Sequence, residues 1–144
     1  MGPQTLIYLA VPSGRFVEVL EWKVRVTDNT TSFPLEARLS MRTTSAAPGS
    51  ALVGSVTKIV ARDGGNTGNN SFTVIGCPST EPSYDVDRFL TPDFGPSTLG
   101  LHWQARHSGD TLLLEPGTEW GLRVMNASFA ASDFFGYMLV GERG

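Results

Sequence analysis

Apolar and polar residues alternate along most of this chain with a period of two residues. The clearest example is PLEARLSMRTT, residues 34–44, where most alternate side chains are apolar and those between them are charged or carry a hydroxyl. This alternation is typical of a strand that packs one face against a core. No window of eleven or more residues carries the apolar stripe of a helix. We therefore predict strands at residues 6–11, 16–27, 34–44, 56–61, 71–75, 85–90, 99–105, 112–114, 120–124 and 135–139.

About eight to ten short strands separated by glycine- and proline-containing turns indicate an all-β fold with no significant helix. An antiparallel β-sandwich, a jelly roll or a barrel would satisfy this pattern. Within residues 16–27 the apolar positions change phase, which indicates a β-bulge near Val19–Leu20. Residues 115–118, Glu-Pro-Gly-Thr, have turn chemistry, because proline presets φ and Gly117 accepts a positive φ. The alternation of positions 135, 137 and 139 predicts a packed final strand.

Length and charge limit the possible partners. With 144 residues the chain is predicted to form a single domain, residues 1–144, that is large enough to bury its own core. Its net charge of −3 argues against binding to duplex nucleic acid, which normally requires a basic stripe. Only Lys23 and Lys58 are lysines, and the arginine bias favours protein interfaces. The run Leu6–Val11 is too short to span a membrane and lacks the basic leader of a signal peptide.

Candidate catalytic and metal-binding residues are few. His102 and His107 are the only histidines, and their spacing of five places them on opposite faces of a regular strand without a third ligand. A Ser–His–acid triad can be assembled from Ser108, His107 and Asp110. However, the G-x-S-x-G elbow is missing, and residues this close in sequence rarely adopt triad geometry. Cys77 is the only cysteine, so no internal disulfide can form, and we interpret it as a small apolar side chain.

Two oxygen-rich segments have plain structural interpretations. Asp85 and Asp87 would share one strand face, as the paired acids of a glycosidase might, but they are interpreted as solvated loop acids. Residues 63–70, DGGNTGNN, lack the alternating acids and the closing glutamate of a calcium loop and are interpreted as a glycine-rich turn. These segments therefore indicate neither a catalytic pair of acids nor a metal site.

The aromatic residues fall into two groups. Trp22, Trp103 and Trp120 are in phase with aliphatic neighbours, which predicts that they belong to the core. Several phenylalanines instead lie in segments rich in proline, serine or aspartate. They either cover an end of the sandwich or contact a partner. These phenylalanines are Phe89, Phe94, Phe129, Phe134 and Phe135.

Four segments in chain order resemble a widespread family of small virion proteins of tailed bacteriophages, the jelly-roll head decoration (cement) proteins. These segments are Leu20–Thr44, Leu101–Gln104, Leu114–Met125 and Gly136–Gly144. Members of that family typically show an R-x-x-R-T-T type strand, a central tryptophan stretch, a Pro-Gly turn before an L-R-L strand, and a final strand after glycine. The chain departs from the family at its end, where Val140–Arg143 replaces an acidic pair.

The resemblance implies a protein that joins the exterior of an icosahedral capsid, often as a homotrimer. Its partners would be the major capsid protein and itself, with no enzyme activity, cofactor, nucleic acid or membrane involved. The alternative function is a tail-tip, neck or receptor-binding virion module of similar fold, in which surface aromatics and residues 66–70 would face a host glycan. A hydrolase or lectin unrelated to virions is a third possibility. Residues 1–15 are predicted to provide the first strand and an N-terminal docking arm. The predicted interface residues are Tyr8, Arg88, Phe89, Phe94 and Phe129.

Overall fold

A computed structural model describes residues 3–27, 33–42, 73–125 and 134–143. Within these ranges the chain forms strands and no helix, so no described helix is long and apolar enough to cross a membrane. The all-β prediction is therefore confirmed. The predicted strand 56–61 and the loop 63–70 lie outside the described residues. The strands are β1 (Gln4–Ala10), β2 (Phe16–Val26), β3 (Pro34–Arg42), β4 (Thr73–Gly76), β5 (Phe89–Pro96), β6 (Leu101–Gln104), β7 (Leu112–Leu114), β8 (Glu119–Val124) and β9 (Phe134–Arg143).

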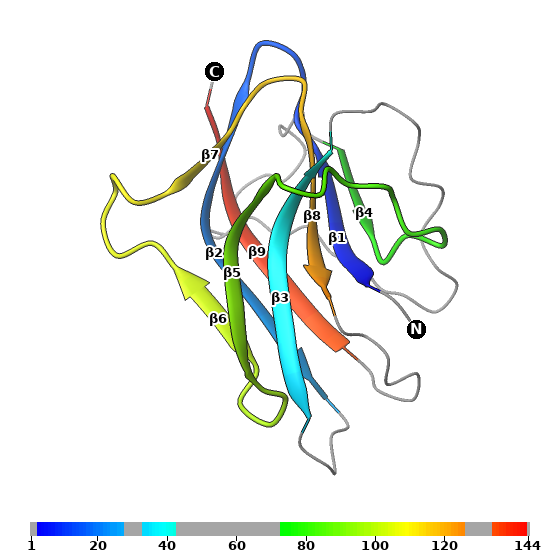
Figure 1. Ribbon diagram of the computed structural model, residues 1–144. Helices are drawn as coiled ribbons and strands as arrows, with labels where there is room; N and C mark the ends of the chain where they lie inside the picture. Colours follow the sequence, from blue (N-terminus) through cyan, green and yellow to red (C-terminus); the bar gives the residue numbers. More distant parts are fainter. Residues whose placement is uncertain (1–2, 28–32, 43–72, 126–133, 144) are drawn as a thin grey trace.

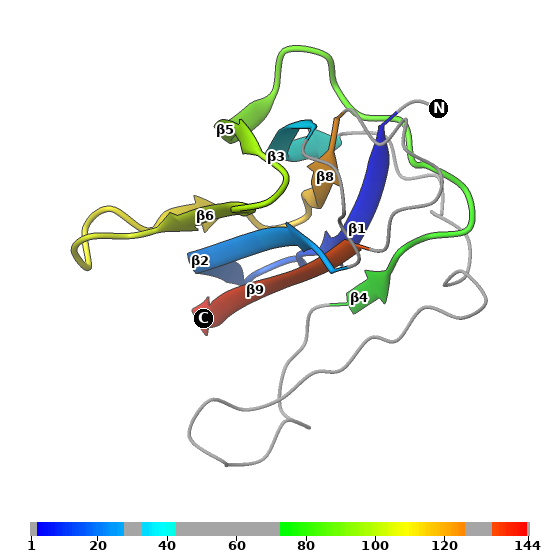
Figure 2. The ribbon, with the colours of Figure 1, turned by 90° about the horizontal axis from the view of Figure 1, so that it is seen from below.

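The strands form two antiparallel sheets that pack face to face (Figures 1 and 2). The five-stranded sheet has the order β4-β1-β8-β3-β5. In the four-stranded sheet β2 pairs with β9 on one side, and on the other side with β6 and β7, which take successive parts of its length. The predicted antiparallel β-sandwich is confirmed, whereas the jelly-roll connectivity stays a prediction.

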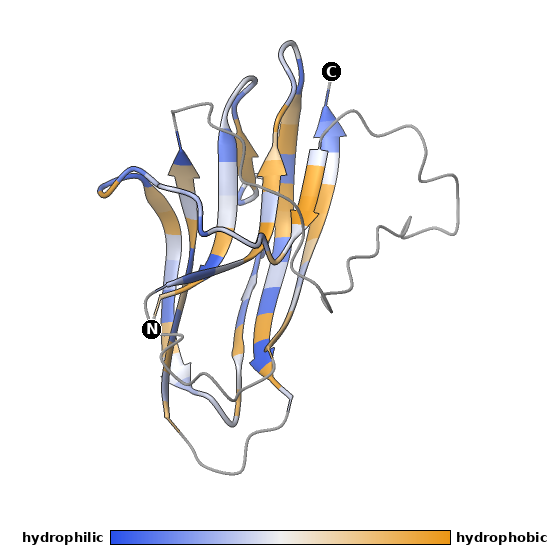
Figure 3. Ribbon diagram, turned by 90° about the vertical axis from the view of Figure 1, so that its right-hand side faces the viewer, coloured by the Kyte–Doolittle hydropathy of each residue, from blue (hydrophilic) through white to orange (hydrophobic). Residues whose placement is uncertain are grey.

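The core lies between the two sheets and uses the alternating positions predicted from the sequence. Figure 3 shows apolar and polar residues alternating along the strands. Trp22 and Trp120 are buried in the core and Trp103 packs against it, which confirms the assignment of the three tryptophans. The buried apolar residues are Leu9, Val11, Val17, Val19, Trp22, Val24, Phe33, Leu35, Ala37, Leu39, Leu101, Leu114, Trp120, Leu122 and Val124.

The β-bulge predicted near Val19–Leu20 is also confirmed. β9 pairs with Val19 and then with Glu21, so Leu20 is the extra residue of β2. The same residue separates the two pairings on the opposite edge, since β7 pairs with Val17–Val19 and β6 with Glu21–Val24. The insertion reverses the phase of the strand, so the valines before it and Trp22 after it both reach the core.

The face of the last strand that was predicted to pack against the core, with residues 135, 137 and 139, is the wrong one. Phe135 pairs with Arg25 and Tyr137 with Lys23, on the face of β9 that points away from the core. The residues of β9 that pack against the core are Phe134, Met138 and Val140. Both faces of this strand are apolar, so the alternation alone could not distinguish the inner face from the outer one.

The strand predicted at residues 85–90 begins later than expected. β5 runs from Phe89 to Pro96, and among the described strands it pairs with β3 alone. An edge strand tolerates Pro92 and Pro96 because one of its sides needs no N–H donors. Thr91 adopts a φ of +49° where the register shifts, and its hydroxyl accepts a 2.9 Å hydrogen bond from the indole N–H of buried Trp22. Because of this irregularity, the apolar residues of β5 do not alternate regularly, and the strand could not be located from a period of two residues.

The connection between β4 and β5, residues 77–88, crosses the outer face of the five-stranded sheet. β4 and β5 lie at opposite edges of that sheet, and Figure 2 shows the connection arching over the side that faces away from the core. We call residues 77–88 the strap. It explains why Ser40 and Arg42, which the sequence placed on the polar face of their strand, are only 1% and 4% exposed.

Candidate functional site

The strap and β5 present the most exposed large apolar side chains of the described residues. Phe94 lies on β5 and is 67% exposed, while Val86 in the strap and Leu99 in the turn after β5 are 81% and 79% exposed. Large apolar side chains at this exposure are characteristic of contact with a partner, and these three lie in one stretch of chain, before, within and after β5. We call β5 with these flanking turns the β5 edge (Figure 1).

The β5 edge is built so that it cannot accept another strand. Pro92, Phe94 and Pro96 occupy alternate positions of β5, and the two prolines have no N–H to donate. The N–H of Phe94 donates to Oδ1 of Asp93 at 3.0 Å, so this donor is already used within the strand. Edge strands protected in this way resist uncontrolled pairing with other chains. A partner at this edge must therefore be held by side chains.

The structure places three of the five predicted interface residues on or beside β5. Phe94 is exposed as described, and Arg88 is 60% exposed and lies 3.9 Å from the Asp85 carboxylate. Phe89 is half-buried, and the Arg38 guanidinium carbon lies 4.1 Å from the centre of its ring. Phe129 lies outside the described residues. The sequence singled out Phe89 and Phe94 as phenylalanines in segments rich in proline, serine or aspartate, without showing that they share one strand.

The prediction that Tyr8 contacts a partner is wrong, because its side chain is only 1% exposed. Tyr8 lies in β1, which is flanked on both sides by β4 and β8. The predicted first strand is thus confirmed, but residues 4–10 are an inner strand of the sheet and not a free docking arm. Alternation alone cannot show that the polar face of a strand is covered by another segment.

Side chains of the strap fix it to the sheet below. The Glu81 carboxylate accepts hydrogen bonds from the Thr5 N–H at 2.6 Å, from the Thr5 hydroxyl at 2.9 Å and from Arg123 Nε at 2.9 Å. The hydroxyls of Tyr84 and Thr5 are 2.8 Å apart, and the Arg123 guanidinium carbon lies 4.3 Å from the Tyr84 ring centre. Gly121 makes this approach possible, because a Cβ there would lie 2.0 Å from the Tyr84 hydroxyl.

The backbone of the strap then leads directly into the β5 edge. Asp85 N–H donates to the carbonyl of Met41 at 2.9 Å, and Met41 N–H donates to the carbonyl of Arg88 at 2.8 Å. These bonds extend the pairing with β3 before β5 begins. The strap therefore holds Arg88 and Phe89 in fixed positions relative to the sheet.

A second polar group lies under the strap. Arg42 Nε and Glu119 Oε2 are 3.3 Å apart on neighbouring strands. Burial and the nearby Glu119 carboxylate raise the pKa of Tyr8. Burial raises the pKa of Tyr84 to about 12, with a smaller contribution from the charge of Glu81. Both tyrosines stay neutral at physiological pH, and the charges of Arg42 and Glu119 face each other. We therefore interpret this cluster as a structural network.

The outer face of the four-stranded sheet carries a different row of side chains. Oε1 of Glu21 accepts a 2.7 Å hydrogen bond from the Tyr137 hydroxyl and lies 2.5 Å from His102 Nε2. The bond to Glu21 raises the pKa of Tyr137. Next to this group, the Arg25 guanidinium carbon lies 4.9 Å from the centre of the Phe135 ring. The sequence did not reveal this row, because the phase of β9 was assigned to the opposite face.

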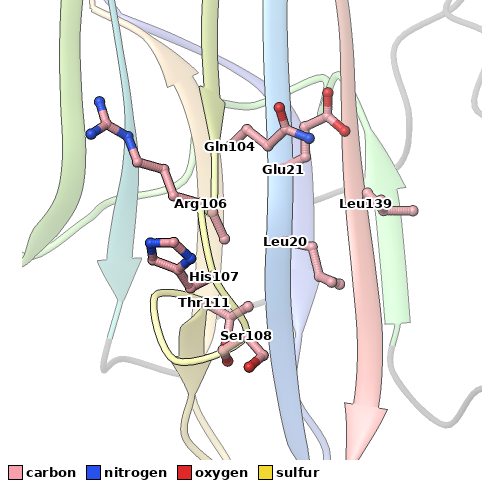
Figure 4. Close-up of a pocket in the computed structure, with 9 residues that line it drawn as sticks. Leu20, Glu21, Gln104, Arg106, His107, Ser108, Thr111 and Leu139 are labelled. Atoms are coloured by element: carbon pink, nitrogen blue, oxygen red, sulfur yellow. The ribbon is translucent and has the colours of Figure 1, made fainter.

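Beside this row lies a pocket that includes two of the three triad candidates (Figure 4). His107 and Ser108 belong to the loop between β6 and β7, where the N–H of Asp110 donates to the carbonyl of His107 at 3.0 Å. The imidazole of His107 and the hydroxyl of Ser108 point apart (Figure 4), so they do not form a nucleophile–base pair in this conformation. Within the described part of the chain, no group of three or more His, Cys, Asp or Glu residues is arranged to hold a metal ion.

Comparisons with known proteins add no assignment. The sequence matches no protein-family model, and searches of curated proteins and of solved structures also give no match. The functional argument therefore depends on the residues themselves and on their arrangement.

Proposed function

We propose that this chain is a head decoration protein of a tailed bacteriophage, with jelly-roll connectivity, which binds the major capsid protein on the exterior of the shell and stabilises the head. The observation that carries the proposal is the β5 edge, which exposes Phe94 on a strand that is closed to strand addition and Val86 and Leu99 in the segments on either side of it. The sequence resemblance described above supplies the identity of the partner.

The β5 edge suits a component of an ordered shell. Phe94 offers an aromatic anchor of the kind that dominates binding energy when it enters a partner's pocket. A strand with open N–H and carbonyl groups would instead invite pairing with any exposed edge, including that of another copy. Pro92, Pro96 and the bonded N–H of Phe94 remove that route. Binding is thereby restricted to partners whose surface is complementary in shape.

Stabilisation of a shell follows from the number of contacts. A stable protein–protein interface buries about 1,600 Å², and each copy that contacts two neighbouring capsid subunits opposes their separation. We propose that the chain acts as a homotrimer, since three linked copies raise one another's effective concentration at the surface. The net charge of −3 and the scarcity of lysine support a position outside the head, away from the genome.

The test uses heads of the phage that encodes this chain, prepared without it, and purified protein added back. We expect the protein to sediment with the heads in hundreds of copies and to raise the temperature at which they release DNA. Phe94→Asp should weaken binding at least tenfold, because it places a charge in an apolar contact. Phe135→Asp is the matched control, since Phe135 is 44% exposed on the other sheet and faces Arg25. It should bind normally.

Three results would overturn the proposal. Heads that do not bind the protein would exclude decoration, and a handful of copies at one vertex would assign the chain to the tail or neck. Equal loss of binding in Phe94→Asp and Phe135→Asp would exclude the β5 edge as the contact. Light scattering tests the trimer separately, since a monomer in the presence of shells contradicts it.

A further inference from the structure

The pocket on the outer face of the four-stranded sheet exists because of the bulge in β2. β6 and β7 leave Leu20 between their two pairings with β2. The N–H of Ala105, just after β6, donates to the carbonyl of Leu20 at 2.9 Å. The chain then leaves the sheet and returns at Leu112, so residues 105–111 form a raised wall beside the bulge. The pocket between this wall and β9 is open to solvent and has a volume of about 260 Å³.

The lining of this pocket is apolar in the middle and polar at both ends (Figure 4). Leu20 and Leu139 provide the apolar part. The amide of Gln104 and the carboxylate of Glu21 lie side by side at one end, and Ser108 and Thr111 lie at the other. The Gln104 amide is exposed and makes no hydrogen bond with another described residue.

The polar groups define the chemistry of a ligand. A carboxylate only accepts hydrogen bonds, whereas an amide and a hydroxyl both donate and accept. The guanidinium of Arg106 points away from the pocket (Figure 4), so no arginine is positioned to neutralise an anion there. A ligand that satisfies both ends needs groups that donate and accept, and its middle must pack against leucine side chains. A sugar ring has this arrangement, with hydroxyls at its rim and C–H groups on its faces.

We propose that this pocket binds one neutral saccharide unit, with Gln104 bonding hydroxyls at one rim and Ser108 at the opposite rim. No residue of the β5 edge lines the pocket, so the site is separate from the proposed capsid contact. Binding is weak, in the millimolar range, since the pocket is open to solvent and encloses only part of a ring. Tyr137, bonded to Glu21, extends the surface along β9 for a second unit.

The test is a titration of isotope-labelled protein with glucose, galactose, mannose and N-acetylglucosamine, followed by the amide resonances. At least one sugar should cause saturable shifts confined to Leu20, Gln104–Thr111 and the middle of β9. Gln104→Ala should raise the Kd at least fivefold, and Ser108→Trp should abolish the shifts by filling the pocket. Leu113→Ala, on the same sheet outside the pocket, should leave the Kd unchanged. A dispersed spectrum of each variant shows that it is folded.

Several outcomes would overturn the inference. These are the absence of saturable shifts with every sugar, shifts located at the β5 edge, or a Kd that neither Gln104→Ala nor Ser108→Trp changes. A response to sodium phosphate in place of the sugars would show that the pocket selects anions. If Phe94→Asp loses capsid binding but still shows the sugar-induced shifts, the saccharide site is unaffected. The two proposals can therefore fail independently of each other.

Discussion

Replacement of Gly121 by alanine tests whether the strap is closely packed on the five-stranded sheet. Gly121 lies in β8, in register with Tyr8 on one side and Ser40 on the other. A Cβ at this position would lie 2.0 Å from the Tyr84 hydroxyl oxygen, 2.6 Å from Cζ and 2.9 Å from Cε1. These are atoms of a rigid ring, so the clash cannot be relieved by rotation of a flexible chain end. The strap itself must move.

The expected cost can be worked out from the contacts that this movement breaks. The Tyr84 hydroxyl must retreat from 2.0 Å to about 3.4 Å from the new methyl group, which breaks its 2.8 Å contact with Thr5. Overpacking of this kind costs about 1–3 kcal/mol, and a lost hydrogen bond costs about 0.5–1.5 kcal/mol. Alanine in a strand recovers about 0.5–1 kcal/mol relative to glycine. We therefore expect Gly121→Ala to lower the free energy of unfolding by about 2–3 kcal/mol.

A double-mutant cycle followed by urea denaturation and tryptophan fluorescence measures this cost. Tyr84→Ala removes the obstructing ring, so in that background Gly121→Ala should no longer destabilise the fold and should raise its stability by up to about 1 kcal/mol. Gly109→Ala is the glycine control, because nothing lies within 4 Å of its Cβ, and it should be nearly neutral. If Gly121→Ala costs the same with and without the Tyr84 ring, the strap does not pack as described and the reasoning is refuted.

Three further predictions concern stability. Thr91→Val should cost about 1–3 kcal/mol by leaving the buried indole N–H of Trp22 without its acceptor, whereas Thr91→Ser should cost less; equal costs in denaturation would contradict this role. The pKa of Tyr84 is about 12 in the folded chain against an ordinary value of 10, so the contribution of Tyr84 to stability is complete below pH 10 and is lost as the pH rises to 12. Tyr84→Phe should therefore reduce the slope of the unfolding free energy against pH between pH 10 and 12. An unchanged slope would exclude Tyr84 as the source of this pH dependence. Gly100→Ala should lower the melting temperature, because Gly100 has a φ of +70° and a Cβ there would lie 2.7 Å from the Val24 carbonyl oxygen; a melting temperature equal to that of the wild type would show that this turn accommodates a side chain.

The sequence predicts those parts of the fold in which one strand face is apolar and the other polar. β3 illustrates this, since Leu35, Ala37 and Leu39 are all buried as the alternation requires. The bulge in β2 could also be predicted, because an inserted residue leaves a phase change in the apolar pattern itself. In these segments the local signal and the tertiary structure agree.

The remaining features depend on contacts between segments that are distant in sequence. Tyr8 is polar at its tip and lies within the apolar run of β1, so nothing local indicates that the strap covers it. β9 is apolar on both faces, so only its register with β2 shows that Phe135 points outward. The pocket likewise requires residues from β2, β6 and β9 with the following loop, and no motif in one segment can indicate it.

The two sheets therefore offer different kinds of binding surface, for a physical reason that can be tested. The strap covers the outer face of the five-stranded sheet and bonds to it through Glu81 and Tyr84, so contact with a partner falls to the edges of that sheet, of which the β5 edge carries the exposed apolar side chains. The four-stranded sheet has no such cover among the described residues, and its bulge provides a pocket. Because the strap continues directly into β5 but shares no lining residue with the pocket, Glu81→Ala should disorder the β5 edge and weaken capsid binding while leaving saccharide shifts in place. Simultaneous loss of both would show that the two surfaces depend on a common element.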